Sequence, residues 1–149
     1  MKKKFVLVLL LIFFSITFII LFSSLHKVEI YIPEKITNKS IIKFSAKDLF
    51  SNKEIDFNSL VKNDKLTIIN IWASWCQPCR EEHPFLMKLG DDKNINLIGI
   101  SYKDNIKNSK KFLNDFGNPF SNILIDKNGL ISINIGAYGV PETYIINAD

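Results

Sequence analysis

Three apolar stretches with different patterns define the main predicted elements of the chain. Residues 5–22 are apolar except at Ser15 and Thr17, which is typical of a single long helix. Residues 66–72 are rich in Ile and Thr and predict a buried strand. Residues 95–100 predict a second buried strand. A helix is expected between these two strands, so we predict that they are parallel.

The expected helix between the strands covers residues 77–89 and follows a break at residues 73–75. Pro84 lies inside it, and proline removes one backbone hydrogen bond, so we expect a kink there. Gly90 is the expected end of the helix. The apolar residues expected to face the sheet are Phe85, Leu86 and Leu89.

The remaining elements are predicted from shorter signals. Asp104 and Asn105 are candidate caps for a helix over residues 106–116, whose lysines predict a solvated face and which Gly117 ends. Residues 130–135 fit either a strand or a helical turn. The other expected elements are a short strand at 41–44, a hairpin or turn region from 45 that ends in a helical turn at 57–60, a turn at 63–64, a strand at 123–125 followed by a turn at 126–129, and a strand at 143–146.

The apolar stretch at residues 5–22 predicts a membrane anchor. As a helix its 18 residues span about 27 Å, close to the hydrocarbon thickness of a bilayer. We predict an uncleaved anchor at 1–25, a tether at 26–40 and a folded domain at 41–149; the alternative is a signal peptide removed after export. Three lysines precede the stretch, so the positive-inside rule predicts a cytoplasmic N-terminus and an exported domain.

The net charge of the part after the apolar stretch is informative about possible partners. Three of the 19 basic residues precede the apolar stretch, which leaves 16 against 15 acidic residues in the remainder. The exported part is therefore nearly neutral, and its charge gives no argument for binding nucleic acid.

The two cysteines of the chain, Cys76 and Cys79, lie where the buried strand gives way to the helix. Unpaired backbone N–H groups at a helix start favour an anion, and such a position lowers the pKa of a thiol. The spacing of three brings both cysteines to one helix face, which predicts a redox-active dithiol. The alternatives are a structural disulfide, which would close a very short loop, and a metal site completed by His26 and His83.

Four ordered motifs carry a family resemblance that extends from about residue 41 to the end of the chain. They are WASWCQPC (72–79), YKD (102–104), GNPF (117–120) and GAYGVPET (136–143). With them the chain resembles the CcmG/DsbE group, the membrane-anchored thioredoxin-like reductases of cytochrome c maturation. The resemblance implies an α/β thioredoxin-like fold, a mixed sheet flanked by helices. Such domains continue with a further strand and a final helix, so we expect the C-terminal part to be incomplete, one apolar sheet face to be uncovered, and an extended chain to be more stable.

The resemblance also implies roles at the dithiol. Cys76 is the expected attacking thiol, more exposed than Cys79, which resolves the mixed disulfide. Asn70 stands where many thioredoxins have a buried Asp, and in the related reductases a Glu at the position of Glu82 is thought to take over its proton transfer. We therefore assign Glu82 as acid/base; the alternative is a solvated carboxylate like that of Glu81.

A second part of the expected site is the segment Val140-Pro141-Glu142. The resemblance implies a cis peptide bond before Pro141 and a partner peptide held in extended form by the backbone of Val140. Glu142 is expected to line the same groove, or else to be a surface carboxylate. Trp75 is a candidate for docking partners, and simple packing is an equal alternative for it and for Trp72.

The resulting interpretation is a thiol-disulfide oxidoreductase held at the bacterial inner membrane with its domain in the periplasm. It would reduce apocytochrome c, or a haem-ligation partner, with electrons from a transmembrane thiol reductase. The sequence contains no flavin, nicotinamide or metal motif, so the dithiol itself is the expected redox group. The alternatives are a related anchored reductase or oxidase for other exported proteins, and a non-catalytic module that holds apocytochrome or haem.

Overall fold

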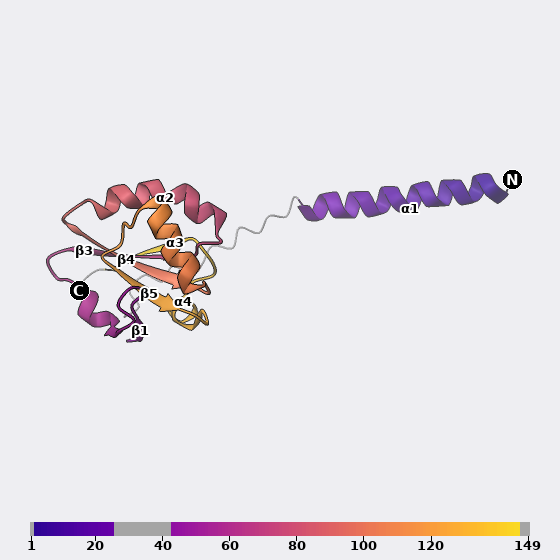
Figure 1. Ribbon diagram of the computed structural model, residues 1–149. Coiled ribbons are helices and arrows are strands. Elements are labelled where there is room, and N and C mark those ends of the chain that lie inside the picture. Colours follow the sequence, from indigo (N-terminus) through magenta and orange to yellow (C-terminus); the bar gives the residue numbers. More distant parts are fainter. Residues whose placement is uncertain (1, 26–42, 147–149) are drawn as a thin grey trace. The chain divides into compact units, whose positions relative to one another are not determined.

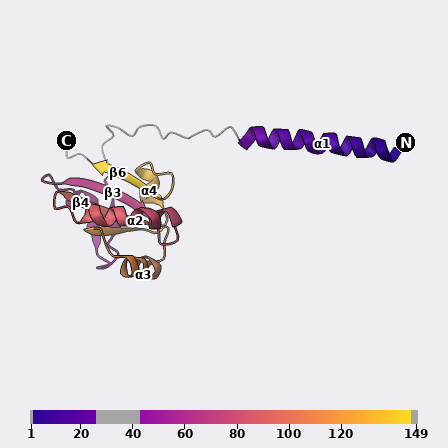
Figure 2. The ribbon, with the colours of Figure 1, turned by 90° about the horizontal axis from the view of Figure 1, so that it is seen from above.

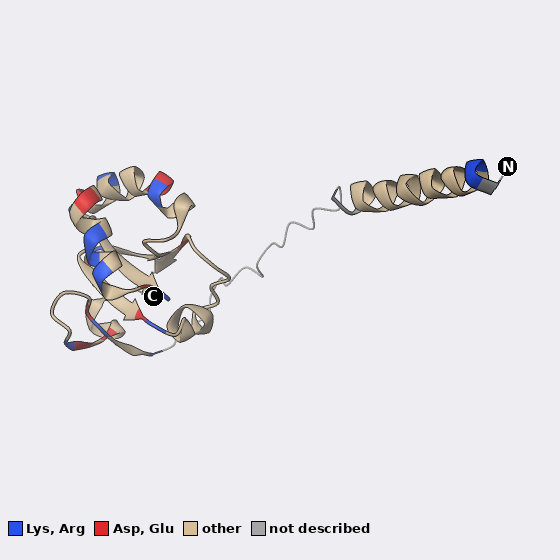
Figure 3. Ribbon diagram, turned by 45° about the vertical axis from the view of Figure 1, so that its right-hand side comes forward, with Lys and Arg blue, Asp and Glu red and all other residues tan. Residues whose placement is uncertain are grey.

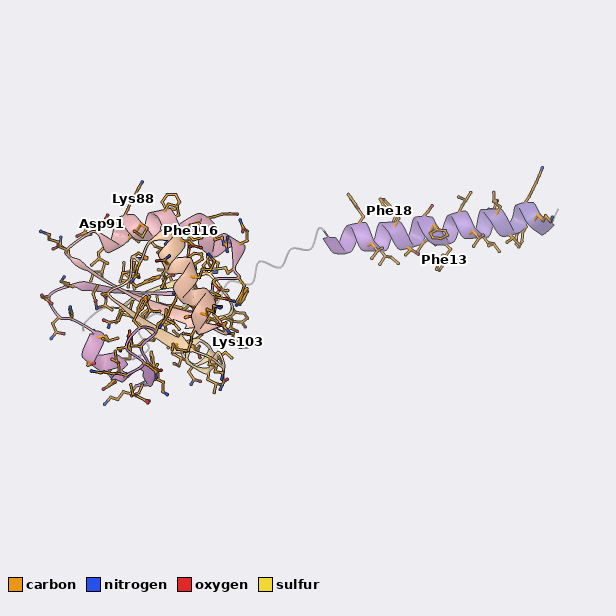
Figure 4. The ribbon with its side chains drawn as sticks, in the orientation of Figure 1. Phe13, Phe18, Lys88, Asp91, Lys103 and Phe116 are labelled. Atoms are coloured by element: carbon orange, nitrogen blue, oxygen red, sulfur yellow. A yellow bond between two sulfur atoms is a disulfide. The ribbon has the colours of Figure 1, made fainter. Side chains whose placement is uncertain are left out.

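The computed structural model describes residues 2–25 and 43–146, and the chain divides into two compact units, Met1–Thr37 and Asn38–Asp149. In its described residues the first unit forms the helix α1 (Lys2–Leu25). Its segment Lys3–Ser23 is long and apolar enough to cross a membrane, a test that an N-terminal signal sequence also passes. Basic residues appear only at its start in Figure 3, and Phe13 and Phe18 project from it in Figure 4.

The second unit is built on a four-stranded mixed sheet of order β5-β4-β3-β6. The inner strands β3 (Leu66–Trp72) and β4 (Ile95–Tyr102) are parallel, as predicted. β5 (Asn122–Asp126) pairs with β4 in parallel, and β6 (Glu142–Ile146) pairs with β3 antiparallel. Figure 2 shows β6 beside β3, so β3 has a partner on each side.

Helices and a hairpin complete the unit, with α2 and β1 on opposite sides of the sheet in Figure 1. α2 and α3 begin and end close to the predicted limits, and the ambiguous segment after β5 is helical. These elements are β1 (Ser45–Lys47), β2 (Glu54–Asp56), the 3-10 helix η1 (Phe57–Leu60), α2 (Gln77–Gly90), α3 (Ile106–Phe116) and α4 (Leu130–Asn134).

The core consists of two apolar clusters, one on each face of the sheet. The first joins the sheet to α2 and α3 and includes both cysteines, Trp72 and Leu86. The second joins the sheet to the β1–β2 hairpin and η1, with Phe57 fully buried. The isoleucines of the inner strands on this second face are no more than 1% exposed: Ile69, Ile71, Ile98 and Ile100. The inner strands are therefore covered on both faces, and the expectation of an open apolar face is wrong for them, although Ile145 of β6 is 68% exposed.

Two further predictions are corrected by the packing. Phe85 is 66% exposed, because the buried residues of α2 recur at Cys79, His83 and Leu86, and this periodicity turns Phe85 away from the sheet. The first strand begins at Ser45 instead of residue 41: of the predicted residues 41–44, the first two lie outside the described range and the other two are not in a strand. The ring of Phe44 instead stacks on that of Phe57, and the backbone oxygen of Phe44 accepts a hydrogen bond from the backbone N–H of Phe57.

Gly90 is the last residue of α2, one residue beyond the predicted end at Leu89. A Cβ atom at this position would collide with the carbonyl oxygen of Pro119. The absence of a side chain therefore lets the end of the helix lie directly on the loop that precedes β5.

Replacement of Phe57 by alanine tests the second cluster. Phe57→Ala should lower the free energy of unfolding by about 3–5 kcal/mol, because it removes a fully buried ring and leaves a cavity. The measurement is urea unfolding of the full chain in detergent micelles, followed by tryptophan fluorescence. Phe85→Ala is the matched control and should stay within about 0.5 kcal/mol of the parent. Equal losses in the two variants would contradict the described packing.

Candidate active site

The two cysteines form a disulfide at the start of α2, with 5.3 Å between their Cα atoms. Cys76 is the N-cap of the helix, and its Sγ accepts a hydrogen bond of 3.2 Å from the backbone N–H of Cys79. When the disulfide is reduced, this N–H group stabilises a thiolate on Cys76, as do the positive end of the helix and its unpaired amides. The local geometry is thus suited to nucleophilic sulfur chemistry.

The expected difference in exposure between the cysteines is absent from this oxidised form. Cys76 is 3% exposed and Cys79 2%, and both belong to the first apolar cluster.

The two tryptophans beside the disulfide have different environments. Trp72 is 2% exposed and packs between Phe112 and Phe120, so its role is in the core. Trp75 is 59% exposed, and its indole N–H donates a hydrogen bond of 3.3 Å to the backbone oxygen of Lys103. Of the two, Trp75 is the one that presents an aromatic surface next to Cys76.

Glu82 is directed at the sheet rather than at solvent. Its Oε1 accepts a hydrogen bond of 2.9 Å from the side-chain amide of Asn70, a fully buried residue in the middle of β3. The same amide donates to Thr143 on β6 at 3.1 Å. Glu81, by contrast, is exposed and accepts a hydrogen bond from the side-chain amide of Gln77. Of the two carboxylates, Glu82 is the one turned toward the interior.

The peptide bond between Val140 and Pro141 is cis, as the resemblance implies. Val140 is half-buried and packs against both apolar clusters, including the one that contains the disulfide. Glu142 uses both carboxylate oxygens on nearby residues. Its Oε1 accepts from the N–H groups of Tyr138 and Gly139 in the preceding loop at 2.6 and 2.9 Å, and its Oε2 accepts from the hydroxyl of Tyr144 in β6 at 2.6 Å. In this geometry Glu142 fixes the loop that presents the cis-proline.

His83 is buried on the same side of α2 as Cys79 and packs against α3. It is 4% exposed, its Nε2 lies 3.1 Å from the backbone oxygen of Gly117, and its ring packs edge-on against Phe112. His26, the other candidate metal ligand, lies outside the described residues. Within residues 2–25 and 43–146, no group of three or more His, Cys, Asp or Glu side chains is arranged to hold a metal ion.

Sequence reasoning gave no role at the site to Arg80 and saw Asp104 only as a helix cap. The guanidinium of Arg80 lies over the rings of Phe112 and Phe116, at 5.7 and 5.3 Å from their centroids, and donates to the backbone oxygen of Ser74. The cap of α3 is Asn105, while Asp104 binds Ser74 in the loop before the cysteines. Such contacts join residues distant in sequence, and the only hint was that Asp104 ends the YKD motif.

A mixed sheet with a dithiol pair at a helix start and a cis-proline before the adjoining strand defines a thioredoxin-like α/β protein. The AhpC/TSA family matches residues 37–149, and the chain belongs to this family. Thiol:disulfide interchange protein CycY of Rhizobium leguminosarum bv. viciae is 49% identical over 85 residues, 57% of this chain and 46% of that protein. Thiol:disulfide interchange protein DsbE of Haemophilus influenzae is 34% identical over 99% of this chain and 82% of its own length.

The structural comparison agrees on the fold. A secreted Mycobacterium tuberculosis disulfide oxidoreductase, described as homologous to E. coli DsbE, superimposes with a TM-score of 0.63 and 24% identity over 71% of this chain and 77% of that chain. The chain matches only about half the length of the CycY protein and 61% of DsbE from Vibrio cholerae.

The environment of Tyr144 predicts that the free energy of unfolding decreases at alkaline pH. Burial and the hydrogen bond to Glu142 raise the pKa of Tyr144 above its usual value of about 10. Above that pH the unfolded chain releases the phenol proton while the folded chain keeps it, so the free energy of unfolding falls as pH rises. Tyr144→Phe should show a shallower fall in urea unfolding at increasing alkaline pH. Parallel curves for variant and parent would contradict the assignment.

Proposed function

We propose that this protein is a membrane-anchored thiol-disulfide oxidoreductase that works as a reductant. The observation that carries the proposal is the Cys76–Cys79 disulfide at the start of α2, with the Cys79 N–H aimed at the Cys76 sulfur. Two further facts support it: the cis-proline segment on the neighbouring strand and the relatives named thiol:disulfide interchange proteins.

The reaction transfers two electrons from the dithiol to a partner disulfide. The Cys76 thiolate attacks one sulfur of that disulfide, the partner's S–S bond breaks, and its second sulfur leaves as a thiolate that takes a proton. Cys79 then loses its proton and attacks the Cys76 sulfur. This breaks the mixed disulfide, releases the partner's other thiol and closes the Cys76–Cys79 disulfide. The dithiol is the redox group, and a second dithiol protein must return the two electrons.

Glu82 is the proposed acid/base of the second step. It approaches from the helix turn that follows Cys79, and its bond to the Asn70 amide holds the carboxylate toward the interior. The Glu82 carboxylate can accept the Cys79 proton, whereas the side-chain amide of Asn70 cannot. Trp75, Val140 and Pro141 are the proposed contacts for the partner peptide, with Glu142 holding the cis-proline loop in place.

The proposed location is the bacterial inner membrane, with α1 as a single anchor, the N-terminus in the cytoplasm and the domain in the periplasm. Support comes from the apolar length of α1 and the lysines at its start. The proposed substrates are disulfides of apocytochrome c or of a haem-ligation partner, whose thiols must be free before haem is attached. The proposed electron donor is a transmembrane thiol reductase.

The equilibrium reduction potential tests the direction of electron flow. We expect a value near that of thioredoxin, about −270 mV, for the full chain in micelles equilibrated with glutathione or dithiothreitol buffers. A value near −120 mV, typical of a strong periplasmic oxidant, would make the protein a disulfide donor and overturn the proposal. The Cys76→Ser/Cys79→Ser double variant should fail to restore cytochrome c maturation in cells that lack the parent protein. Retained activity would indicate a module that holds apocytochrome or haem without turnover.

Glu82→Gln tests the acid/base role. Glutamine keeps an oxygen that can accept the Asn70 bond but cannot take a proton, so resolution of the mixed disulfide should slow by about 100-fold or more. Rapid acid quenching should reveal the accumulated mixed disulfide. Glu81→Gln is the matched control and should react like the parent. Unchanged kinetics and thiol pKa values in Glu82→Gln would remove Glu82 from the mechanism.

A further inference from the structure

Asp104, in the turn between β4 and α3, is the centre of a hydrogen-bond network next to the disulfide. Its carboxylate accepts four hydrogen bonds, two on each oxygen. The donors are the backbone N–H of Ser74 at 2.6 Å, the Ser74 hydroxyl at 2.9 Å, the backbone N–H of Asn105 at 2.7 Å and the Ser109 hydroxyl at 2.9 Å. Ser109 is fully buried, and its hydroxyl lies 2.9 Å from that of Ser101 on β4.

The network ties the loop before Cys76 to the turn between β4 and α3. Ser74 precedes Cys76 by two residues and directs both of its donors at Asp104. Trp75 adds a third bond, from its indole N–H to the backbone oxygen of Lys103, a residue labelled in Figure 4. The loop at residues 73–75 thus donates three hydrogen bonds to a turn about thirty residues further along the chain.

This restraint has most effect when the disulfide is open. In the oxidised form the bond to Cys79 restrains the Cys76 sulfur covalently. In the reduced form that restraint is gone, and the sulfur stays near the Cys79 N–H only if the backbone of Cys76 keeps its position. That backbone follows the Asp104-bound loop directly, and its N–H donates to the carbonyl of Ala73 at 3.2 Å.

We propose that Asp104 is a positioning residue that keeps Cys76 over the helix start in the reduced protein and so raises its thiolate fraction. The inference rests on the proposed function and deepens it. A competing effect has the opposite sign, because a nearby carboxylate charge disfavours a thiolate. Positioning dominates because the four donors around the Asp104 carboxylate offset its negative charge. The Cys76 thiolate, in contrast, is stabilised by a few N–H groups that act only when they point at the sulfur.

Two variants separate the two effects. Asp104→Asn removes the charge and replaces one acceptor oxygen with an NH2 group, which faces hydrogen-bond donors and cannot accept from them. Ser74→Ala leaves the charge in place and removes only one hydrogen bond between the loop and Asp104. Under positioning, both variants shift the Cys76 titration to higher pH. Under a pure charge effect, Asp104→Asn shifts it to lower pH and Ser74→Ala does not move it.

The experiment follows the Cys76 titration by thiolate absorbance in the reduced full chain in micelles, together with the equilibrium constant for oxidation by glutathione. We expect the thiolate fraction at neutral pH to fall about three- to tenfold in both variants. The reduced form loses the same stabilisation, so the equilibrium constant for oxidation rises by a similar factor. A tenfold rise corresponds to a reduction potential about 30 mV lower.

Asn105→Ala is the matched control. It removes the cap bond from the Lys107 N–H to the Asn105 side chain, beside Asp104 but without contact to the loop. It should lower the thermal midpoint while changing the thiolate fraction less than about twofold. An equal shift in Asn105→Ala, or a shift to lower pH in Asp104→Asn, would overturn the inference. Neither readout needs a partner protein, so failure of the parent to reduce its partner would count against the proposed function alone.

Discussion

The structure depends on the double pairing of β3, a strand buried on both faces and hydrogen-bonded along both edges. Its end leads straight into the disulfide, and its antiparallel partner β6 begins directly after the cis-proline. A change in register by one residue on β3 would turn every side chain of the strand to the opposite face. The relative position of the cysteines and the proline segment therefore follows from one strand and its two neighbours.

A polar residue at the centre of that strand is costly unless its groups are paired. Asn70 is fully buried and uses its amide hydrogens on Glu82 and Thr143, so three separate elements meet at one side chain. Its oxygen has no partner among the described residues. A sheet built only for stability would carry an apolar residue here, and the amide is better explained as a holder for the Glu82 carboxylate.

Much of this arrangement could be predicted from the sequence. The patterns of residues 66–72, 77–89 and 95–100 are long and regular, so hydrophobic periodicity was sufficient for the strands and the active-site helix. The cis bond before Pro141 came from the family resemblance, because spacing carries no information about peptide isomers. Phe85 was misplaced because its neighbours on either side are apolar or proline, and only the actual rotation of the helix decides which of them is buried.

The parts that could not be predicted are hydrogen bonds whose partners no sequence pattern specifies. The Ser74–Asp104 bonds connect positions thirty apart, and the bonds of Glu142 to its own loop depend on a turn whose backbone angles no residue pattern specifies. Composition and periodicity describe which residues are buried, whereas these bonds depend on the backbone geometry of the folded chain.

The sheet also separates the two apolar clusters from each other. The cysteines belong to the cluster on one face, while Phe57 and the hairpin belong to the cluster on the other. Substitutions in the second cluster can change the free energy of unfolding without altering a residue that packs with the disulfide, whereas substitutions in the first cluster affect both stability and the surroundings of the sulfur atoms. Val140 packs against both clusters, so a substitution there changes both properties as well.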